Sequence, residues 1–237
     1  MGHGMFLTHD NKIKWQWIGW GAILTTVLVV SGIAWFDKPV YLFLRQFDCW
    51  LWRLFDLIFD AKMWIIVSFI VLLVFYIKKS IKSKPRYRNS KNQPSLMACF
   101  NDAFDKTRNS YAFYVLCSVL AASIVGKLLK IVIGRMRPVF FEALDKTGFV
   151  PFSTDWAFNS MPSGHTFASF AGLVMLGLLA PKIKWFTWTL AIIIGVSRVC
   201  VGAHWPSDVI FGAFIGMVAA DLVKAGLRYY NSDREDK

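Results

Sequence analysis

The sequence has few acidic residues and few cysteines, and both shortages limit the kind of protein it encodes. Asp and Glu number 15 against 27 Lys and Arg. The four cysteines lack the spacing of metal ligands and predict no disulfide framework. The sequence also has no internal repeat and no acidic cluster of the kind that holds Mg²⁺. We therefore expect neither a metal nor another cofactor.

Long apolar runs dominate the chain, in which 56% of the residues are hydrophobic, including 21 Phe and 11 Trp. Several runs approach or exceed the length of about 20 residues that crosses a bilayer core. The first run is too long for a signal peptide and lacks an Ala-x-Ala cleavage pattern, so we expect it to be retained. We predict an all-α polytopic membrane protein in which residues 1–237 form one membrane-embedded domain. Its bundle of six transmembrane helices is expected at 15–36, 61–77, 111–133, 165–180, 184–201 and 208–225.

The basic residues lie mainly in the loops between these runs. A net charge of +12 would by itself suit a nucleic-acid-binding protein, but basic loops between apolar runs are typical of membrane proteins. Counting Lys and Arg in each loop predicts that both termini are cytoplasmic and that segments 37–60, 134–164 and 202–207 face outward. The expected surroundings are a lipid bilayer, and we expect no nucleic acid among the partners.

A basic loop is expected on the cytoplasmic side at about 78–110. Its first part, KKSIKSKPRYRNSKNQPS (78–95), would either bind anionic lipid headgroups or act only as a topology signal in a solvated loop. We favour the topology signal.

Residues 40–60 carry a polar stripe with helical spacing between the first two spans. This pattern predicts an amphipathic helix that lies in the outer membrane interface. Such a helix would either shape a lipid entrance or serve as structural packing, and we favour packing. The stripe consists of Arg45, Asp48, Trp52, Asp56 and Asp60.

Three polar patches fall on the predicted outward side, where a membrane protein does not keep ionisable groups without a use. In the first, KLLKIVIGRMRP, Lys130 and Arg137 are seven residues apart, which is two turns of a helix that Pro138 would end. Two cations on one face suit a phosphate, although cations at the end of a span also snorkel to the interface. Snorkelling is what we expect of Lys127 and Arg135.

The second patch, NSMPSGHTFASFAG, opens an apolar helix at a membrane boundary. Pro162 suits the first helical turn, and the free N–H groups of a helix start attract an anion. Ser163 adds a hydroxyl, and Gly164 permits close approach to the backbone. His165 would donate a proton to a leaving oxygen; the alternative is an interfacial histidine at an ordinary helix start. The expected cap is Asn159 or Ser160.

The third patch, SRVCVGAHWPSD, places Arg198 at the end of the fifth span. His204 and Asp208 are four residues apart at a helix start, which would bring a carboxylate under an imidazole. Such a pair either caps the helix or orients a nucleophilic histidine whose other nitrogen is free to attack. Together the patches supply three cations, two histidines, one carboxylate and one anion-binding helix start. This set suits phosphoryl transfer through a phosphohistidine.

In these motifs the sequence resembles the type 2 phosphatidic acid phosphatase family, which shares its site with vanadium haloperoxidases. The family pattern is Lys-x6-Arg-Pro, then Pro-Ser-Gly-His, then Ser-Arg-x5-His-x3-Asp. Residues 130–138, 162–165 and 197–208 match every defined position. The resemblance covers about 127–216 and the six-span layout, and it leaves the first two spans and the basic loop unassigned.

The resemblance implies a role for each matched residue. His204 would be the nucleophile, Asp208 would orient it, and His165 would be the general acid that protonates the leaving group. The phosphate would be held by Lys130, Arg137, Arg198, Ser163 and Gly164. The family uses no metal for catalysis, and its fold is a helical bundle, here embedded in membrane.

The expected function is hydrolysis of a phosphorylated membrane lipid at the periplasmic face of a bacterial inner membrane. General likeness to bacterial lipid A phosphatases ranks lipid A phosphate first, then undecaprenyl diphosphate, then phosphatidylglycerol phosphate. One alternative is a lipid phosphotransferase that uses the same phosphohistidine. Another is a non-catalytic lipid-binding or transport protein, which the intact His204 and Asp208 disfavour. A haloperoxidase is disfavoured because those relatives are soluble.

Overall fold

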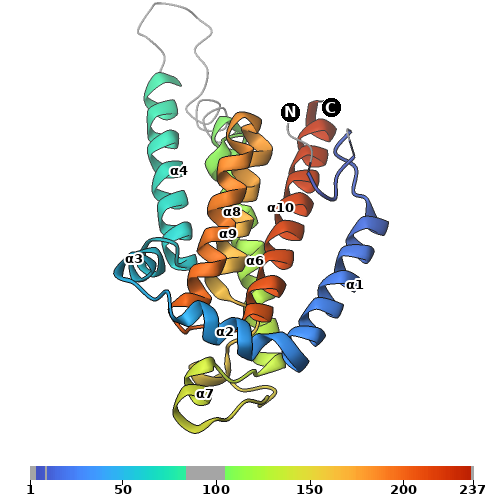
Figure 1. The fold of residues 1–237 in the computed structure, drawn as a ribbon. Helices are drawn as coiled ribbons and strands as arrows, with labels where there is room; N and C mark the ends of the chain where they lie inside the picture. The colour runs from blue at the N-terminus through green and yellow to red at the C-terminus, as the bar shows by residue number, and fades with distance from the viewer. Residues whose placement is uncertain (1–3, 9, 84–104, 236–237) are drawn as a thin grey trace, which may run out of the picture.

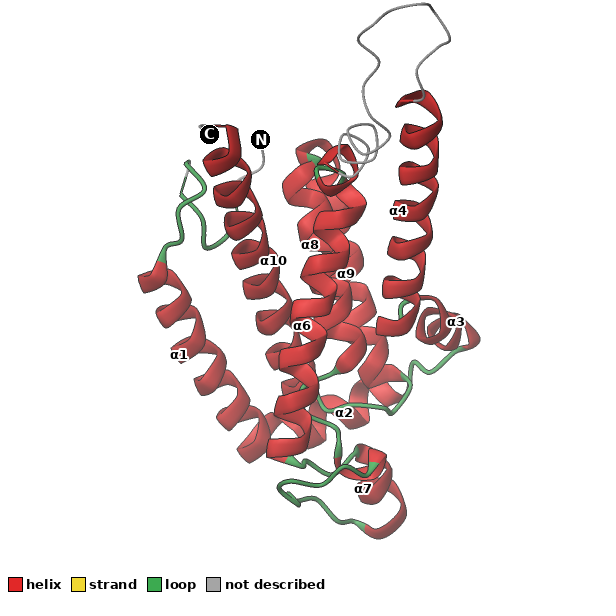
Figure 2. Cartoon of the chain, turned by 180° about the vertical axis from the view of Figure 1, so that it is seen from behind, coloured by secondary structure: helices red, strands yellow, loops and turns green. Residues whose placement is uncertain are grey.

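The computed structural model describes residues 4–8, 10–83 and 105–235, and these residues form helices joined by loops (Figures 1 and 2). The helices are α1 (Trp15–Ser31), α2 (Asp37–Arg45), α3 (Trp50–Ile58), α4 (Ala61–Ser83), α6 (Tyr111–Ile133), α7 (Pro138–Leu144), α8 (Gly164–Leu179), α9 (Lys184–Cys200) and α10 (Pro206–Glu235). The prediction of a basic loop rests mainly on residues 84–104, which lie outside the described residues. The all-α prediction is confirmed for the described part of the chain.

Five helical stretches are long and apolar enough to cross a membrane, namely Trp15–Arg45, Ala61–Ile81, Tyr111–Ile133, Pro181–Cys200 and Pro206–Ser232. They correspond to five of the six expected spans. The other one, α8, is apolar but has only 16 residues. Twelve of them are buried, so α8 is enclosed by its neighbours along most of its length. Taken together, these helices make the chain a multi-pass membrane protein.

Helix α8 lies at the centre of the bundle and packs against α6, α9 and α10, while α4 and α1 stand at opposite sides (Figures 1 and 2). Close contact between α8 and α10 depends on small residues. A Cβ added to Gly216 would lie 2.6 Å from the Phe167 carbonyl oxygen, and one added to Gly212 would lie 2.9 Å from the Ser163 oxygen. Small residues let helix backbones approach in this way inside membranes. This contact fixes the start of α8 against the start of α10.

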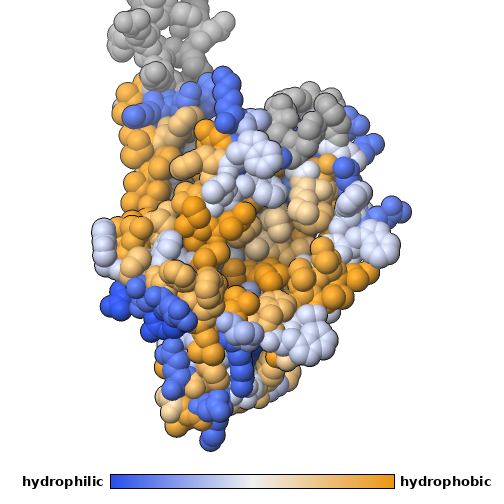
Figure 3. Space-filling model, viewed as in Figure 1, coloured by the Kyte–Doolittle hydropathy of each residue, from blue (hydrophilic) through white to orange (hydrophobic). Residues whose placement is uncertain are grey.

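The outer surface is apolar between two polar ends. Figure 3 shows hydrophobic side chains across the middle of one face, with hydrophilic ones at the upper edge and around the lower end. Trp20 on α1 and Phe69 on α4 are 68% and 59% exposed. Lipid tails would cover such side chains, because a large apolar area exposed to water is unfavourable.

The prediction of one interfacial helix over 40–60 is wrong. The first helical stretch continues through a π-helical turn, Gly32–Phe36, into α2, which crosses the lower end of the bundle in Figure 1. The chain then breaks before α3. Arg45 ends α2 and donates hydrogen bonds to Glu142 and to the Cys200 carbonyl oxygen, which ties this end to the bundle. The polar stripe is therefore divided between two short helices.

The two ends of the bundle are different. The start of α1, the end of α4 and the end of α10 lie at one end, whereas α2, α3 and α7 lie at the other (Figure 1). The three polar motifs lie at the end that carries α7. This arrangement separates them from the segments expected to be cytoplasmic.

Candidate active site

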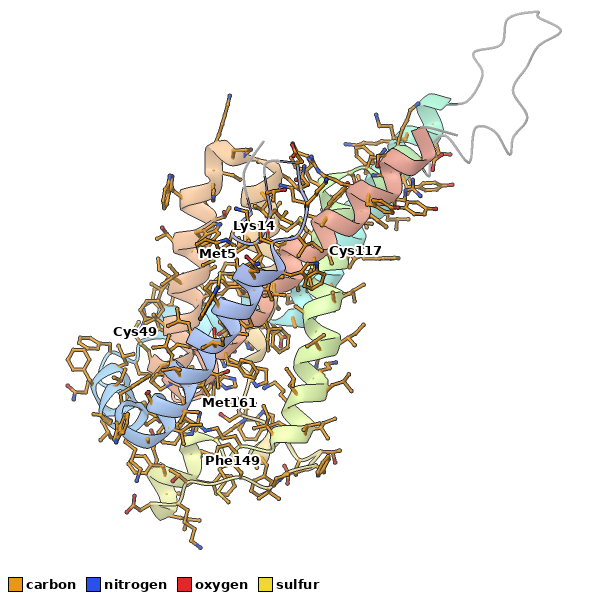
Figure 4. All side chains as sticks on the ribbon, turned by 90° about the vertical axis from the view of Figure 1, so that its right-hand side faces the viewer. Met5, Lys14, Cys49, Cys117, Phe149 and Met161 are labelled. Atoms are coloured by element: carbon orange, nitrogen blue, oxygen red, sulfur yellow. The ribbon has the colours of Figure 1, made fainter. Side chains whose placement is uncertain are left out.

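A cavity of about 690 Å³ opens at the α7 end of the bundle. Six of the eight predicted site residues line it: Lys130, Arg137, Gly164, His165, Arg198 and His204. The other two, Ser163 and Asp208, are fully buried. Figure 4 shows Met161, which precedes the Pro-Ser-Gly-His motif, near the same end as Phe149, whereas Lys14 lies farther toward the other end.

Lys130 and Arg137 meet at the cavity, but the expected two-turn helix between them is wrong. Helix α6 ends at Ile133 because Gly134 adopts a left-handed conformation with φ of 61° and its N–H bonds the Lys130 carbonyl oxygen. Arg137 caps the next helix, and Pro138 begins that helix rather than ending the previous one. The side chains converge on the Asn159 carbonyl oxygen, at 2.7 Å from Lys130 Nζ and 3.4 Å from Arg137 Nη2.

Helix α8 begins at Gly164, so the expected cap at Asn159 or Ser160 is also wrong. Ser163 is the cap residue, and its N–H bonds the Asp208 carbonyl oxygen at 3.0 Å. Its hydroxyl accepts a hydrogen bond from Thr166 Oγ1 at 2.9 Å. Because Gly164 in the first turn lines the cavity, the positive end of the helix dipole lies beside it.

His204 and Asp208 lie together at the start of α10. His204 Nδ1 is 3.6 Å from Asp208 Oδ2, which also accepts hydrogen bonds from the Ser160 hydroxyl at 2.5 Å and the Trp205 N–H at 2.9 Å. The Nδ1 side of the ring therefore faces the carboxylate, and Nε2 is the nitrogen left for attack. Burial lowers the pKa of His204 well below its usual value, against the opposing effect of the Asp208 hydrogen bond. A lowered pKa keeps the ring neutral at neutral pH, and a neutral ring has the lone pair that a nucleophile needs.

This pKa shift predicts an unusual pH dependence. The neutral ring predominates above the lowered pKa, so kcat/KM should stay constant as the pH falls from about 7.5 to about 6.5, the ordinary pKa of histidine. It should decline only at lower pH. The measurement is kcat/KM for 4-nitrophenyl phosphate, whose pH profile reports the free enzyme. A decline centred near pH 6.5 or above would contradict a neutral, desolvated His204.

The position of the Arg135 side chain differs most from what the sequence predicted. Instead of snorkelling, its side chain is buried, with Nη1 2.5 Å from Asp208 Oδ1 and Nη2 2.7 Å from Asp37 Oδ2. Ser207 holds Asp37 as well. Its hydroxyl donates to Asp37 Oδ2, and its N–H donates to Asp37 Oδ1. Burial alone would lower the pKa of Arg135, but the two carboxylates outweigh it and raise the pKa. Lys127, by contrast, is exposed.

Asp37 and Arg135 form a support for Asp208 that sequence reasoning missed. Asp37 belongs to α2, 98 residues before Arg135, and is 3% exposed. No local motif could connect the two. The only available signal was an acidic residue at the end of a membrane span, where an unpaired charge is costly.

Arg198 and His165 share a partner that the sequence interpretation assigned to packing. Asp56 Oδ1 lies 2.5 Å from Arg198 Nη1 and 2.9 Å from His165 Nε2. Its hydrogen bond with His165, together with the Arg198 charge, outweighs partial burial and lowers the pKa of Asp56 to about 2. Asp56 is therefore ionised at neutral pH. Arg137 keeps its charge as well, because burial lowers its pKa only to about 10.

Comparison with known proteins gives the relatives of this chain. A lipid A 1-phosphatase of Rhizobium johnstonii is 40% identical over 111 residues, which are 45% of this chain and 46% of the relative. An undecaprenyl-diphosphatase of Sulfolobus acidocaldarius is 36% identical over 115 residues, 48% of this chain and 53% of the relative. The chain thus spans about half the length of these curated relatives.

A solved structure has the same fold over nearly the whole chain. The crystal structure of a transmembrane PAP2 type phosphatidylglycerolphosphate phosphatase from Bacillus subtilis aligns with a TM-score of 0.51 at 17% identity, covering 93% of this chain and 97% of that one. The sequence profile of the PAP2 superfamily matches residues 111–231, which is about half of the chain and contains all eight predicted site residues. By this match the chain belongs to the PAP2 superfamily.

Proposed function

We propose that the protein is a membrane lipid phosphatase that works through a phosphohistidine at His204. The observation that carries the proposal is the convergence of three motifs on one cavity, where Lys130, Arg137 and Arg198 face a buried, neutral histidine. The names of the relatives add support, since they act on lipid A or on undecaprenyl diphosphate.

In the first step, His204 Nε2 attacks phosphorus, the P–N bond forms, and the bond from phosphorus to the lipid oxygen breaks. The leaving oxygen takes a proton from His165, and Asp208 stabilises the positive charge on the His204 ring. The three cations and the start of α8 bind the phosphoryl oxygens. In the second step, water gives its proton to His165 and attacks phosphorus, which releases phosphate and restores His204.

Because side-chain cations supply the positive charge in this scheme, activity is expected to survive treatment with EDTA. The measurement is phosphate release before and after dialysis against EDTA, with a parallel sample that receives Mg²⁺ afterwards. Similar rates in all three samples are expected. Loss of turnover on chelation, recovered with Mg²⁺, would contradict the scheme.

We propose that the cavity faces the periplasm of a bacterial inner membrane and that both termini are cytoplasmic. The basic residues at the end of α4, Lys78 and Lys79, support this orientation, because they lie at the end opposite the cavity. The proposed substrates are lipid A phosphate first, then undecaprenyl diphosphate and phosphatidylglycerol phosphate.

The decisive experiment is a lipid panel with purified protein in detergent. Free phosphate and newly phosphorylated lipid would both be measured for the three substrates. Free phosphate, released fastest from lipid A, is the expected result. Phosphorylated lipid without free phosphate would instead identify a phosphotransferase, and no turnover of any lipid would contradict the proposed function.

A further inference from the structure

Helix α3 brings a carboxylate into the candidate active site from outside the part of the chain that matches the family. Asp56 lies near the end of α3, and its side chain is 47% exposed. Its backbone oxygen and its Oδ1 are each 2.9 Å from His165 Nε2. The same Oδ1 is 2.5 Å from Arg198 Nη1. One carboxylate oxygen thus contacts both a candidate general acid and a candidate phosphate ligand.

These contacts determine which atoms remain for a substrate. With Nε2 of His165 directed at Asp56, the other ring nitrogen, Nδ1, is left to give a proton to the leaving oxygen. His165 and Asp56 therefore repeat the arrangement of His204 and Asp208, in which one ring nitrogen meets a carboxylate and the other has no hydrogen-bond partner among the described residues.

The N–H groups of the Arg198 guanidinium also differ in their partners. Its Nη1 bonds Asp56, whereas its Nε is buried and makes no hydrogen bond with the described residues. The Arg198 side chain also lines the cavity, where a guanidinium N–H that does not bond Asp56 can donate to a phosphoryl oxygen. Asp56 therefore does not have to leave Arg198 for a phosphate to bind there.

We propose that Asp56 is a positioning residue for phosphoryl transfer, which holds His165 and Arg198 so that His165 Nδ1 and the cavity-facing side of the Arg198 guanidinium meet the substrate. This inference rests on the proposed function. The hydrogen bond from His165 and the Arg198 charge lower the pKa of Asp56 to about 2, so the carboxylate is ionised at neutral pH and can accept hydrogen bonds from both side chains. Asp56 itself touches neither the leaving group nor phosphorus.

The test compares Asp56→Asn with wild type on two esters. Phosphatidylglycerol phosphate has an alkoxide leaving group that needs a proton, whereas 4-nitrophenyl phosphate releases a stable nitrophenolate that needs none. The quantity to compare is kcat/KM, which covers only the steps up to departure of the leaving group and leaves out the hydrolysis of the phosphohistidine that both esters share. A residue that positions the general acid should lower kcat/KM for the lipid by about 10- to 100-fold, as part of the usual contribution of general acid catalysis. The loss for the nitrophenyl ester should be about tenfold smaller, since in this first step only the Arg198 contact affects it.

The control is Asp145→Asn at the same end of the bundle, where the exposed Asp145 side chain is not among the residues that line the cavity. Near wild-type kcat/KM on both esters is expected, because Asn readily adopts the left-handed conformation, with φ of 50°, that this residue has at the end of α7. In a His165→Ala background, Asp56→Asn should lower kcat/KM for the two esters equally, since the general acid that it positions is gone.

Equal losses for both esters in the otherwise wild-type protein would overturn the inference, because a merely structural defect does not depend on the leaving group. An increase in kcat or a lower KM would also overturn it, since Asp56 would then be competing with phosphate. A wild-type protein that hydrolysed neither ester would overturn the proposed function together with this inference.

Discussion

The His204→Ala protein is expected to lose at least about 10⁴-fold in kcat, as enzymes do when a covalent nucleophile is removed. The physical reason is that Nε2 of this ring is the atom that would bond phosphorus, and the remaining cations and helix start only bind the substrate. The measurement is phosphate release from the best lipid of the panel. A second measurement is ³²P retained on the protein after rapid quenching, which should be present in wild type and absent from the variant.

A fold control is needed because His204 is 2% exposed. Cys200→Ala removes another buried side chain from the same connection between α9 and α10 without changing the cavity lining. Both variants should have melting temperatures close to each other. Turnover of His204→Ala within tenfold of wild type, or ³²P label on that variant, would contradict the phosphohistidine.

Arg135→Met is expected to destabilise the protein by about 3–5 kcal/mol, the usual cost of breaking a buried ion pair by removing one partner. Two carboxylates depend on this guanidinium. Asp208 is fully buried and Asp37 is 3% exposed, so each would keep a negative charge away from water without its cation. The measurement is unfolding in detergent by heat or denaturant. Activity should fall as well, because Asp208 would lose the bond that holds it.

Lys127→Met is the matched control for this prediction. Lys127 has the same charge and lies eight residues earlier, but its side chain is exposed, so a change within about 0.5 kcal/mol is expected. Adding Asp37→Asn to Arg135→Met should recover part of the lost stability, since one uncompensated carboxylate is removed. If Arg135→Met unfolded like Lys127→Met, the buried cluster would not contribute to stability.

The local motifs predicted more of the site than of the surrounding geometry. Every residue chosen from the three motifs lies in or directly beside one cavity, because each motif has its own turn that directs the side chains. The backbone between Lys130 and Arg137 was predicted wrongly, since one left-handed glycine ends the helix three residues before Arg137. The cap of α8 was also predicted wrongly, since the helix begins at Gly164, after Pro162 rather than with it.

The membrane spans could be predicted from composition rather than from local motifs. Side chains that face lipid must be apolar over the thickness of a bilayer, so sequence alone shows long apolar helices such as α4 and α6. Helix α8 shows the limit of this signal. It is shorter than a usual span, and its burial by neighbouring helices cannot be seen in its own sequence.

The sequence by itself determined the membrane-embedded helical class and the residues of the three motifs, because both depend on composition and on spacing within one segment. Only the tertiary structure decided the partners of the charged groups. It paired Arg135 with Asp37 across 98 residues and Arg198 with Asp56 across 142. Such pairs form because a buried charge needs an opposite charge wherever the packed helices bring one, and that position is fixed by packing rather than by sequence distance.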